Sequence, residues 1–331
     1  MKRFLLFPLC LFTLHGKEIP RAKPEAVGMS SDKLAKAAEA VQGYVDDRKI
    51  AGAITVVARN GRLVHLQTYG QMDIGRKKPM QEDAIFRIFS MSKAIVTAGA
   101  MMLHEEGKFQ LEDPISKFLP QFKKLKVLNA DGDPRPAAKV MTVADLMCHT
   151  SGLSYGFVGN TPVEKAYQKH GIPGRAKDLD EFINKVSKVP LRFEPGEGWL
   201  YSISIDVLGK LIEVWSGQPL DEFLDQRIFE PLDMRDTGFY VPADKLDRFT
   251  ANYGSNYLGK LNRIDDPQNS KYGKPTTFFS GGGGLVSTAR DYLRFLVMIQ
   301  QGGELHGTRL LKVETVKLMT TNQLPKRLMP I

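Results

Sequence analysis

The sequence is poor in cysteine, histidine and tryptophan. Its 331 residues include two cysteines, six histidines and two tryptophans. Cys10 lies in an apolar N-terminal segment, so loss of that segment would leave Cys148 alone and exclude an intrachain disulfide. The histidines are dispersed, and His104-Glu105-Glu106 lacks the second histidine of a zinc-binding helix. We therefore expect a fold held together by packing, with no metal and no cofactor.

Apolar runs long enough to cross a membrane are also missing. Lys2 and Arg3 precede an apolar run over residues 4–14, which is too short to span a bilayer comfortably. A basic start followed by a short apolar run is typical of a secretory signal. We expect residues 1–16 to be a signal peptide and residues 17–331 to form one mature domain. The protein would then be periplasmic or secreted, without a stable membrane anchor.

Charge of one sign is not concentrated in the sequence. The formal net charge is +9, and removal of residues 1–16, which hold two basic and no acidic residues, lowers it to +7. The lysines and arginines are scattered and form no basic stripe with interleaved aromatic residues, so we expect no nucleic-acid partner. A solvated basic surface is the better interpretation. The sequence leaves the oligomeric state open.

The order of hydrophobic patterns predicts an α+β fold. Ser31 is expected to cap a helix that runs to about Arg48. Strand-like segments over residues 53–58 and 63–68 then flank Asn60-Gly61, a strong signal for a β-hairpin. Helical patterns follow over residues 90–107, 142–152, 203–215 and 288–301. An antiparallel sheet flanked by helices, followed by a largely helical lobe, is an α+β arrangement.

Ser90-Met91-Ser92-Lys93 is the first element that indicates chemistry. A separation of three residues on a helix places Ser90 and Lys93 on one face. A serine hydroxyl needs a neighbouring base to become a nucleophile, and burial disfavours the charged form of a lysine, which lets it serve as that base. The alternative is a lysine that reaches from the helix surface into water. The surrounding helix is apolar and should be buried, which favours the catalytic interpretation.

Several further segments resemble the serine beta-lactamase-related family. That family comprises class C beta-lactamases, D,D-peptidases, D-aminopeptidases and related esterases and acyltransferases. The segments keep the family's order and spacing over nearly all of the mature chain, and the esterase branch matches best. They are FRIFSMSK (86–93), LEDP (111–114), CHTSGL (148–153), EPGEGWLYS (194–202) and GGGLVSTA (282–289). The resemblance implies a beta-lactamase/transpeptidase-like fold.

The resemblance also implies roles for Tyr201 and the residue at position 203. Tyr201 would be the tyrosine whose phenol exchanges protons with Ser90 and Lys93, although Trp199 and Tyr201 could simply be packing aromatics. Penicillin-handling relatives carry an asparagine two residues after this tyrosine, whereas this chain has Ile203. An isoleucine offers an acylamide no hydrogen bond, so ester substrates are favoured.

We therefore expect a serine hydrolase that cleaves small carboxylic esters through an acyl-enzyme on Ser90. A beta-lactamase or D,D-peptidase-like enzyme is one alternative, and an inactive relative that binds penicillin or peptidoglycan is another. Ser154, in Gly152-Leu153-Ser154-Tyr155-Gly156, fits the nucleophile elbow of α/β-hydrolases. That elbow requires a preceding strand, and here a helix is expected instead.

The family's third motif, a Gly-containing strand that lines the site, has no clear counterpart. His306-Gly307-Thr308 resembles it but falls in the turn before the helical pattern over residues 313–319. We therefore expect the C-terminal strands to be absent from this chain. By the resemblance, one oxyanion donor, the Ser90 N–H, would then remain where the family uses two. Whether the 331-residue chain is active is left open.

Overall fold

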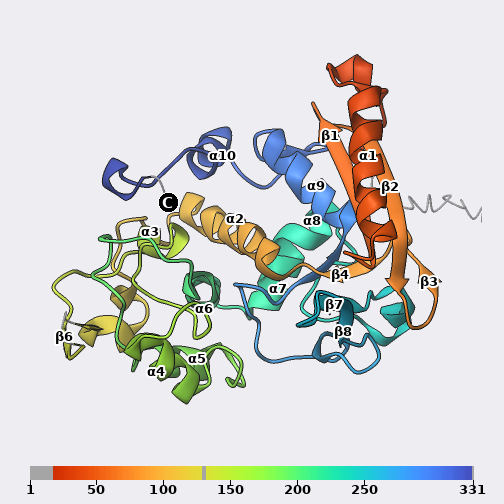
Figure 1. Cartoon of the computed structure of the whole chain (residues 1–331). Helices are drawn as coiled ribbons and strands as arrows, with labels where there is room; N and C mark the ends of the chain where they lie inside the picture. The colour runs from red at the N-terminus through yellow and green to blue at the C-terminus, as the bar shows by residue number, and fades with distance from the viewer. Residues whose placement is uncertain (1–17, 129–131, 330–331) are drawn as a thin grey trace, which may run out of the picture.

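The computed structural model describes residues 18–128 and 132–329 and confirms the α+β class (Figure 1). A β-hairpin and one long helix lie on one side of the molecule, small helices lie on the other, and a central helix lies between them. The signal segment predicted over residues 1–16 lies outside the described residues. Among those residues, no helix has the length and apolarity needed to cross a membrane.

The N-terminal hairpin forms where the sequence predicts it. Strand β1 (Gly52–Arg59) pairs antiparallel with β2 (Arg62–Asp73), and β3 (Lys78–Pro79) adds a short third strand to β2. Asn60 and Gly61 have φ values of 52° and 69°, the left-handed conformation that a tight two-residue turn requires. Within the described ranges, the second edge of β1 has no strand partner.

Helix α1 (Ser31–Asp46) packs on the hairpin, and its start differs by one residue from the prediction. The cap is Ser30, whose side-chain oxygen accepts a hydrogen bond from the Lys33 N–H. Ser31 is the first helical residue. Both serines suit a cap chemically, so only the backbone conformation distinguishes them.

The helical part is centred on α2 (Ser92–Glu105), which packs against α6 (Ser204–Ser216). Most of α2 is buried, as its apolar sequence predicts, but Ala94 is exposed and Thr97 is half-buried. The other helices are α3 (Val143–Met147), α4 (Pro162–His170), α5 (Leu179–Val186), α7 (Leu220–Leu224), α8 (Glu230–Leu232), α9 (Ala289–Gln300) and α10 (Val313–Thr320).

Four two-stranded sheets complete the fold. Their strands are β4 (Ile85–Arg87) with β9 (Val286–Thr288), β5 (Lys126–Leu128) with β6 (Pro134–Pro136), β7 (Asn252–Ser255) with β8 (Leu261–Asp265), and β10 (Glu304–Leu305) with β11 (Thr308–Arg309). His306 and Gly307 form the turn between β10 and β11, with φ values of 53° and 91°. They lie in a turn, as the sequence predicts, rather than on a strand.

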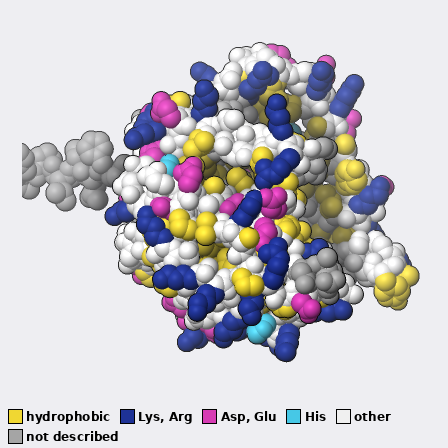
Figure 2. Space-filling model, turned by 90° about the vertical axis from the view of Figure 1, so that its left-hand side faces the viewer, with side chains coloured by type: hydrophobic (Ala, Val, Ile, Leu, Met, Phe, Trp, Pro, Cys, Tyr) yellow, Lys and Arg dark blue, Asp and Glu magenta, His cyan; other side chains and the backbone are white. Residues whose placement is uncertain are grey.

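Charged side chains on the surface are mixed in sign. Figure 2 shows lysines and arginines spread over one face with aspartates and glutamates between them, and they do not merge into one basic patch on that face. This distribution agrees with the solvated basic surface expected from the sequence.

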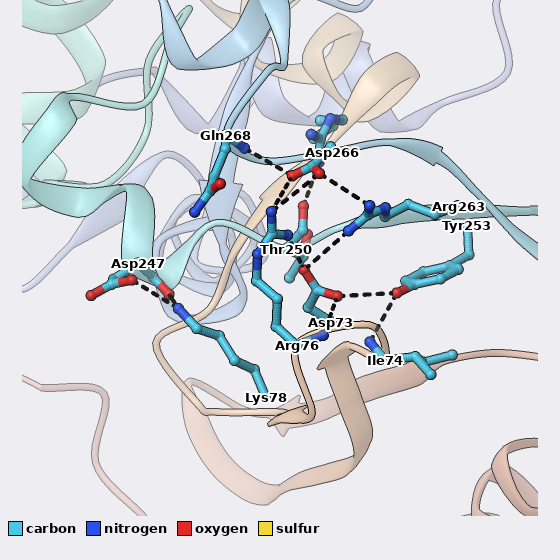
Figure 3. Close-up of polar contacts among 11 residues, drawn as sticks. Asp73, Ile74, Arg76, Lys78, Asp247, Thr250, Tyr253, Arg263, Asp266 and Gln268 are labelled. Carbon is cyan, nitrogen blue, oxygen red and sulfur yellow. Dashed lines mark hydrogen bonds and ion pairs between the residues drawn. The ribbon is translucent and has the colours of Figure 1, made fainter.

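An ionic network attaches the β7–β8 hairpin to the end of β2 (Figure 3). Arg76 bridges Asp73 and Asp266 at 2.5 and 2.9 Å, and Arg263 lies 3.1 Å from Asp266. Burial opposes ionisation of Asp73, but the hydrogen bonds and charge of Arg76 outweigh it and lower the pKa of that carboxyl. Tyr253 from β7 also reaches Asp73 through its hydroxyl, at 3.4 Å. Each charge in this cluster therefore has a partner of opposite sign.

Candidate active site

Ser90 lies at the junction between β4 and α2. The backbone leaves β4, passes Phe89 and forms a 3₁₀ turn over Phe89–Met91 before α2 begins at Ser92. Phe89 has a φ of +43°, a strained conformation for a bulky residue that costs on the order of 1–3 kcal/mol. The Ile88 N–H donates to the Leu285 carbonyl at 3.0 Å and helps to hold this junction. Ser90 is exposed.

Lys93 lies beside Ser90 and is buried, with 9% of its surface exposed. Its Nζ lies 3.2 Å from Ser90 Oγ, 3.3 Å from the Tyr155 hydroxyl and 2.6 Å from the Gly282 carbonyl oxygen. A lysine ammonium has three N–H donors, and here three acceptors surround it. No carboxylate of the described residues forms an ion pair with it. The alternative of a lysine that reaches into water does not fit this geometry.

Tyr201 lies close to Lys93, as the resemblance implies, but the face of its ring, and not its phenol oxygen, is turned toward the lysine amine. Lys93 Nζ lies 4.5 Å from the centroid of the half-buried Tyr201 ring, which favours a nearby cation through its π electrons. The phenol oxygen that accepts a hydrogen bond from Lys93 is that of Tyr155. The proton exchange predicted for Tyr201 therefore stays a prediction.

Tyr155 is a site residue that sequence reasoning missed. Burial raises the pKa of its phenol well above the ordinary value, and the carboxylate of Asp206 acts in the same direction. Tyr155 therefore stays a neutral phenol and can donate its proton. A signal was present: Tyr155 follows Ser154 in the segment compared above with a nucleophile elbow.

His149 lies behind Tyr201 as a neutral imidazole. Its Nδ1 accepts a hydrogen bond from the Ser202 N–H at 3.2 Å, and its ring centroid lies 4.8 Å from that of Tyr201. Burial and the positive charge of Lys93 lower the pKa of His149 to about 4. His149 therefore adds no charge to the site near neutral pH.

An arc of aromatic rings surrounds the lysine. Trp199, His149, Tyr201, Tyr155 and Phe157 follow one another with centroid separations of 6.3, 4.8, 5.7 and 4.8 Å. The inner rings line the buried amine, whereas the two end rings reach the surface: Trp199 is 37% and Phe157 is 75% exposed. Both ends of the arc therefore present apolar aromatic surface to water, which suits contact with an apolar substrate group.

A pocket of about 560 Å³ opens on the exposed side of α2. It runs between α2, α3, α9 and α10 and reaches both Lys93 and His149. Its walls are mainly apolar and include Ala94, Met101, Leu111, Met147, Leu296, Ile299, Leu318 and Met319. This space explains why Ala94 and Thr97 are accessible on a helix whose sequence predicts burial.

Ser154 and Ile203, two other residues singled out in the sequence, are both buried. Ser154 has no exposed surface, follows no strand, and donates its hydroxyl proton to a Glu164 oxygen at 2.7 Å, so it is not placed as an accessible nucleophile. The expectation that Ile203 weakens the recognition of an acylamide stays a prediction. Its apolar side chain has no hydrogen-bonding group, and it lies buried in the hydrophobic core.

The described residues contain no cluster of three or more potential metal ligands. The site itself offers hydroxyls, an amine and backbone groups. The Ser90 N–H belongs to the first turn of a helical segment, where N–H groups have no partner within the helix and can bind a developing oxyanion.

Comparisons with known proteins agree with this architecture. A family model described as Beta-lactamase matches residues 37–328. Protein Rv1367c of Mycobacterium tuberculosis is 37% identical over 289 residues, which are 86% of this chain and 71% of that protein. Esterase EstB of Burkholderia gladioli is 32% identical over 294 residues, which are 84% of this chain and 73% of EstB.

Solved structures give the same result. EstCE1, described as a hydrolase with promiscuous acyltransferase activity, has a TM-score of 0.74 and 29% identity, covering 87% of this chain and 76% of its own. Simvastatin synthase LovD from Aspergillus terreus has a TM-score of 0.75 and 27% identity, covering 90% and 75%. The match in sequence extends over most of the chain and includes the site described above. The chain therefore belongs to the Beta-lactamase family.

Proposed function

We propose that this protein is a serine hydrolase that cleaves carboxylic esters through an acyl-enzyme on Ser90. The observation that carries the proposal is the position of Lys93 Nζ, which is buried and lies within hydrogen-bond distance of Ser90, Tyr155 and the Gly282 carbonyl. A hydroxyl beside a buried amine is the arrangement that nucleophilic catalysis requires.

In the first half of the reaction, Ser90 Oγ attacks the carbonyl carbon of the ester. Its proton passes to Lys93 in the neutral amine form, and the Gly282 carbonyl and the Tyr201 ring stabilise the ammonium that results. The Ser90 N–H stabilises the oxyanion. When the tetrahedral intermediate collapses, the bond to the alcohol oxygen breaks and Tyr155 protonates that oxygen. Lys93 then returns its proton to Tyr155.

In the second half, water attacks the acyl-enzyme. Lys93 accepts the proton of the water molecule, the bond from the acyl carbon to Ser90 Oγ breaks, and the proton returns to that oxygen. The carboxylic acid leaves and the serine is restored. Lys93 serves as the base in both halves because the attacking oxygen, of Ser90 and then of water, occupies equivalent positions, whereas Tyr155 acts in the first half.

The comparisons support an ester substrate rather than a beta-lactam. EstB is named an esterase, and another relative is named lovastatin esterase of Penicillium rubens. Phe157 and Trp199 at the two ends of the aromatic arc favour an apolar group on the substrate. Export of the protein, expected from residues 2–14, is part of the proposal.

Labelling with a fluorophosphonate tests the nucleophile. We expect one adduct per chain by intact-protein mass spectrometry and its location on the peptide that contains Ser90. The Ser90→Ala variant should give no adduct, whereas the Ser154→Ala variant should be labelled like the wild type. An adduct on Ser154 would refute the proposal. A parallel incubation with penicillin and with a p-nitrophenyl ester separates the alternatives, since faster turnover of the penicillin would indicate a beta-lactamase.

A further inference from the structure

Asp206 is a buried carboxylate close to the site, and the mechanism above does not use it. It lies in the first turn of α6 with 1% of its surface exposed. One carboxylate oxygen, Oδ1, accepts two hydrogen bonds from the glycine-rich loop, from the Ser280 hydroxyl at 2.5 Å and from the Gly282 N–H at 3.0 Å. Burial raises the pKa of this carboxyl, and the two hydrogen bonds oppose the shift by stabilising the ionised form.

The glycine-rich loop lies directly against Asp206 and α6. A Cβ added to Gly282 would lie 2.3 Å from Asp206 Oδ2, and one added to Gly281 would lie 2.5 Å from the Ile205 carbonyl oxygen. Real Cβ atoms do not approach other atoms this closely. Glycine is therefore required at both positions, and the loop backbone follows the position of the carboxylate closely.

The same glycine that binds Asp206 also holds the lysine. Gly282 donates its N–H to Asp206 and accepts a hydrogen bond from Lys93 Nζ on its carbonyl oxygen, at 2.6 Å. Asp206 thus lies two hydrogen bonds from the amine without touching it. Its negative charge also helps to raise the pKa of Tyr155, the second acceptor of Lys93.

We propose that Asp206 is a positioning residue for the acyl transfer proposed above, because it fixes the Gly282 carbonyl that orients Lys93 toward Ser90. The inference rests on the proposed function. The carboxylate acts in two ways. It sets the geometry of the loop through Oδ1, and it places a negative charge behind the amine that favours the ammonium formed when Ser90 is deprotonated.

Asp291 provides a matched control for a purely structural role. It occupies the same third position of a helix, α9, and it is also buried, with 7% of its surface exposed. It accepts hydrogen bonds from the Asp236 N–H at 2.7 Å and the Thr237 hydroxyl at 3.0 Å. None of these partners contacts Lys93. If Asp206 only capped its helix, replacing either aspartate should have the same consequence.

The test compares the Asp206→Asn and Asp291→Asn variants with the wild type in the rate of fluorophosphonate labelling of Ser90 as a function of pH. We expect Asp206→Asn to be labelled roughly 10- to 100-fold more slowly, since displacing a reacting group by about 1 Å costs on that order. The acid limb of its pH profile should move to lower pH, because loss of the negative charge disfavours the ammonium. Asp291→Asn should keep the wild-type rate and profile.

The titratable groups around the amine are Tyr155, Tyr201, His149 and Asp206, and of these only Asp206 is changed in the test. Ser280→Ala is a milder variant that removes one donor to the carboxylate and does not contact Lys93. It should slow labelling less than Asp206→Asn does. If Asp206→Asn does not fold, Ser280→Ala takes its place as the test of the positioning role. A wild-type labelling rate and pH profile for Ser280→Ala would then contradict the inference.

A crystal structure of Asp206→Asn separates this inference from the proposed function. We expect the distance from Lys93 Nζ to the Gly282 carbonyl oxygen to exceed hydrogen-bond range. Absence of any Ser90 adduct in the wild type would refute the proposed function, and the crystal structure would still decide the role of Asp206. An unchanged Lys93–Gly282 contact, or equal labelling profiles for wild type and Asp206→Asn, would overturn the inference.

Discussion

Two clusters of charge in this protein are built in opposite ways. Around Arg76, every charge faces a partner of opposite sign, and the cluster is only partly open to water because Asp73 is buried and Arg76 and Asp266 are half-buried. Around Lys93, the buried amine faces a hydroxyl, a phenol and a backbone carbonyl, and the carboxylate of Asp206 reaches it only through a glycine. The first arrangement neutralises each charge with a direct partner. The second leaves the buried amine of Lys93 without a direct carboxylate partner, so that it can exchange a proton with its neighbours.

The difference indicates a structural role for the Arg76 cluster and a chemical role for the Lys93 cluster. A fully paired ionic network contributes to stability through its buried members, and it can be changed without a change in reactivity. A buried amine without a direct carboxylate partner is costly and is retained where a proton has to be transferred. Variants of the Lys93 cluster should therefore lower the reaction rate, whereas variants of the Arg76 cluster should lower the free energy of unfolding.

The largest effect is expected for Lys93→Ala. Loss of the base should reduce the rate of Ser90 labelling and of ester hydrolysis by roughly 10²- to 10⁴-fold, the usual contribution of a positioned general base. The free energy of unfolding, measured with urea, should stay close to that of the wild type or rise, because a buried charge is removed. If the Lys93→Ala protein hydrolyses esters at the wild-type rate, Lys93 is not the base.

The next effect concerns acid stability. The pKa of His149 is lowered from 6.5 to about 4, so the unfolded chain binds this proton more readily than the folded chain. Stability should be unaffected by this group above pH 6.5 and should fall as the pH drops from about 6.5 to about 4. The full loss is on the order of 3 kcal/mol. In urea titrations at several pH values, His149→Asn should remove this part of the pH dependence, and a slope like that of the wild type would argue against it.

Arg76→Gln should lower stability and spare the chemistry. It leaves Asp73, which is 2% exposed, without its main partner, at an expected cost of about 1–3 kcal/mol of unfolding free energy. The matched variant is Arg263→Gln, whose side chain is more exposed and which should cost less than about 1 kcal/mol. Ser90 labelling rates should match the wild type in both. Slower labelling in Arg76→Gln would show that the network reaches the site.

The smallest effect is expected for the exposed end of the aromatic arc. Phe157→Ser removes apolar surface where a substrate group can lie, and it should raise KM for esters with long acyl chains by roughly 3- to 10-fold, equivalent to about 1 kcal/mol. Acetate esters should be affected less. Tyr257→Ser is the control, since Tyr257 is 94% exposed between the paired strands β7 and β8 and does not belong to the arc of aromatic rings around Lys93. Equal effects of both variants on KM would rule out a specific role for Phe157.

The sequence predicted what depends on short-range patterns. Asn60-Gly61 located the hairpin, and Ser90 with Lys93 located the centre of the candidate site, since three residues on a helical segment fix their proximity. The helical pattern over residues 142–152 was also confirmed in part: Thr142, the first residue of the pattern, caps α3, but α3 ends at Met147, earlier than the pattern predicts. Helix ends depend on local tertiary contacts that the pattern does not show.

The sequence could not predict contacts made across long separations through the backbone. Tyr155 and Gly282 are 62 and 189 positions away from Lys93, and Gly282 contributes a carbonyl, which every residue has. Asp206 reaches the site only through that carbonyl. The burial of Ile203 was not predictable for a related reason, since whether its side chain points to the core or to the surface depends on how α6 begins.

The pairing of β4 with β9 has a consequence for biosynthesis. Residues 85–87 are held by residues 286–288, and the Ile88 N–H is held by the Leu285 carbonyl. The ribosome makes the N-terminal partner about two hundred residues before the C-terminal one, so the strained turn at Phe89 has no support during most of translation. The Gly282 carbonyl, which accepts a hydrogen bond from Lys93, is also synthesised late. The arrangement of Ser90 and Lys93 is therefore complete only when nearly the whole described chain has left the ribosome, so the proposed activity should be absent from a nascent chain.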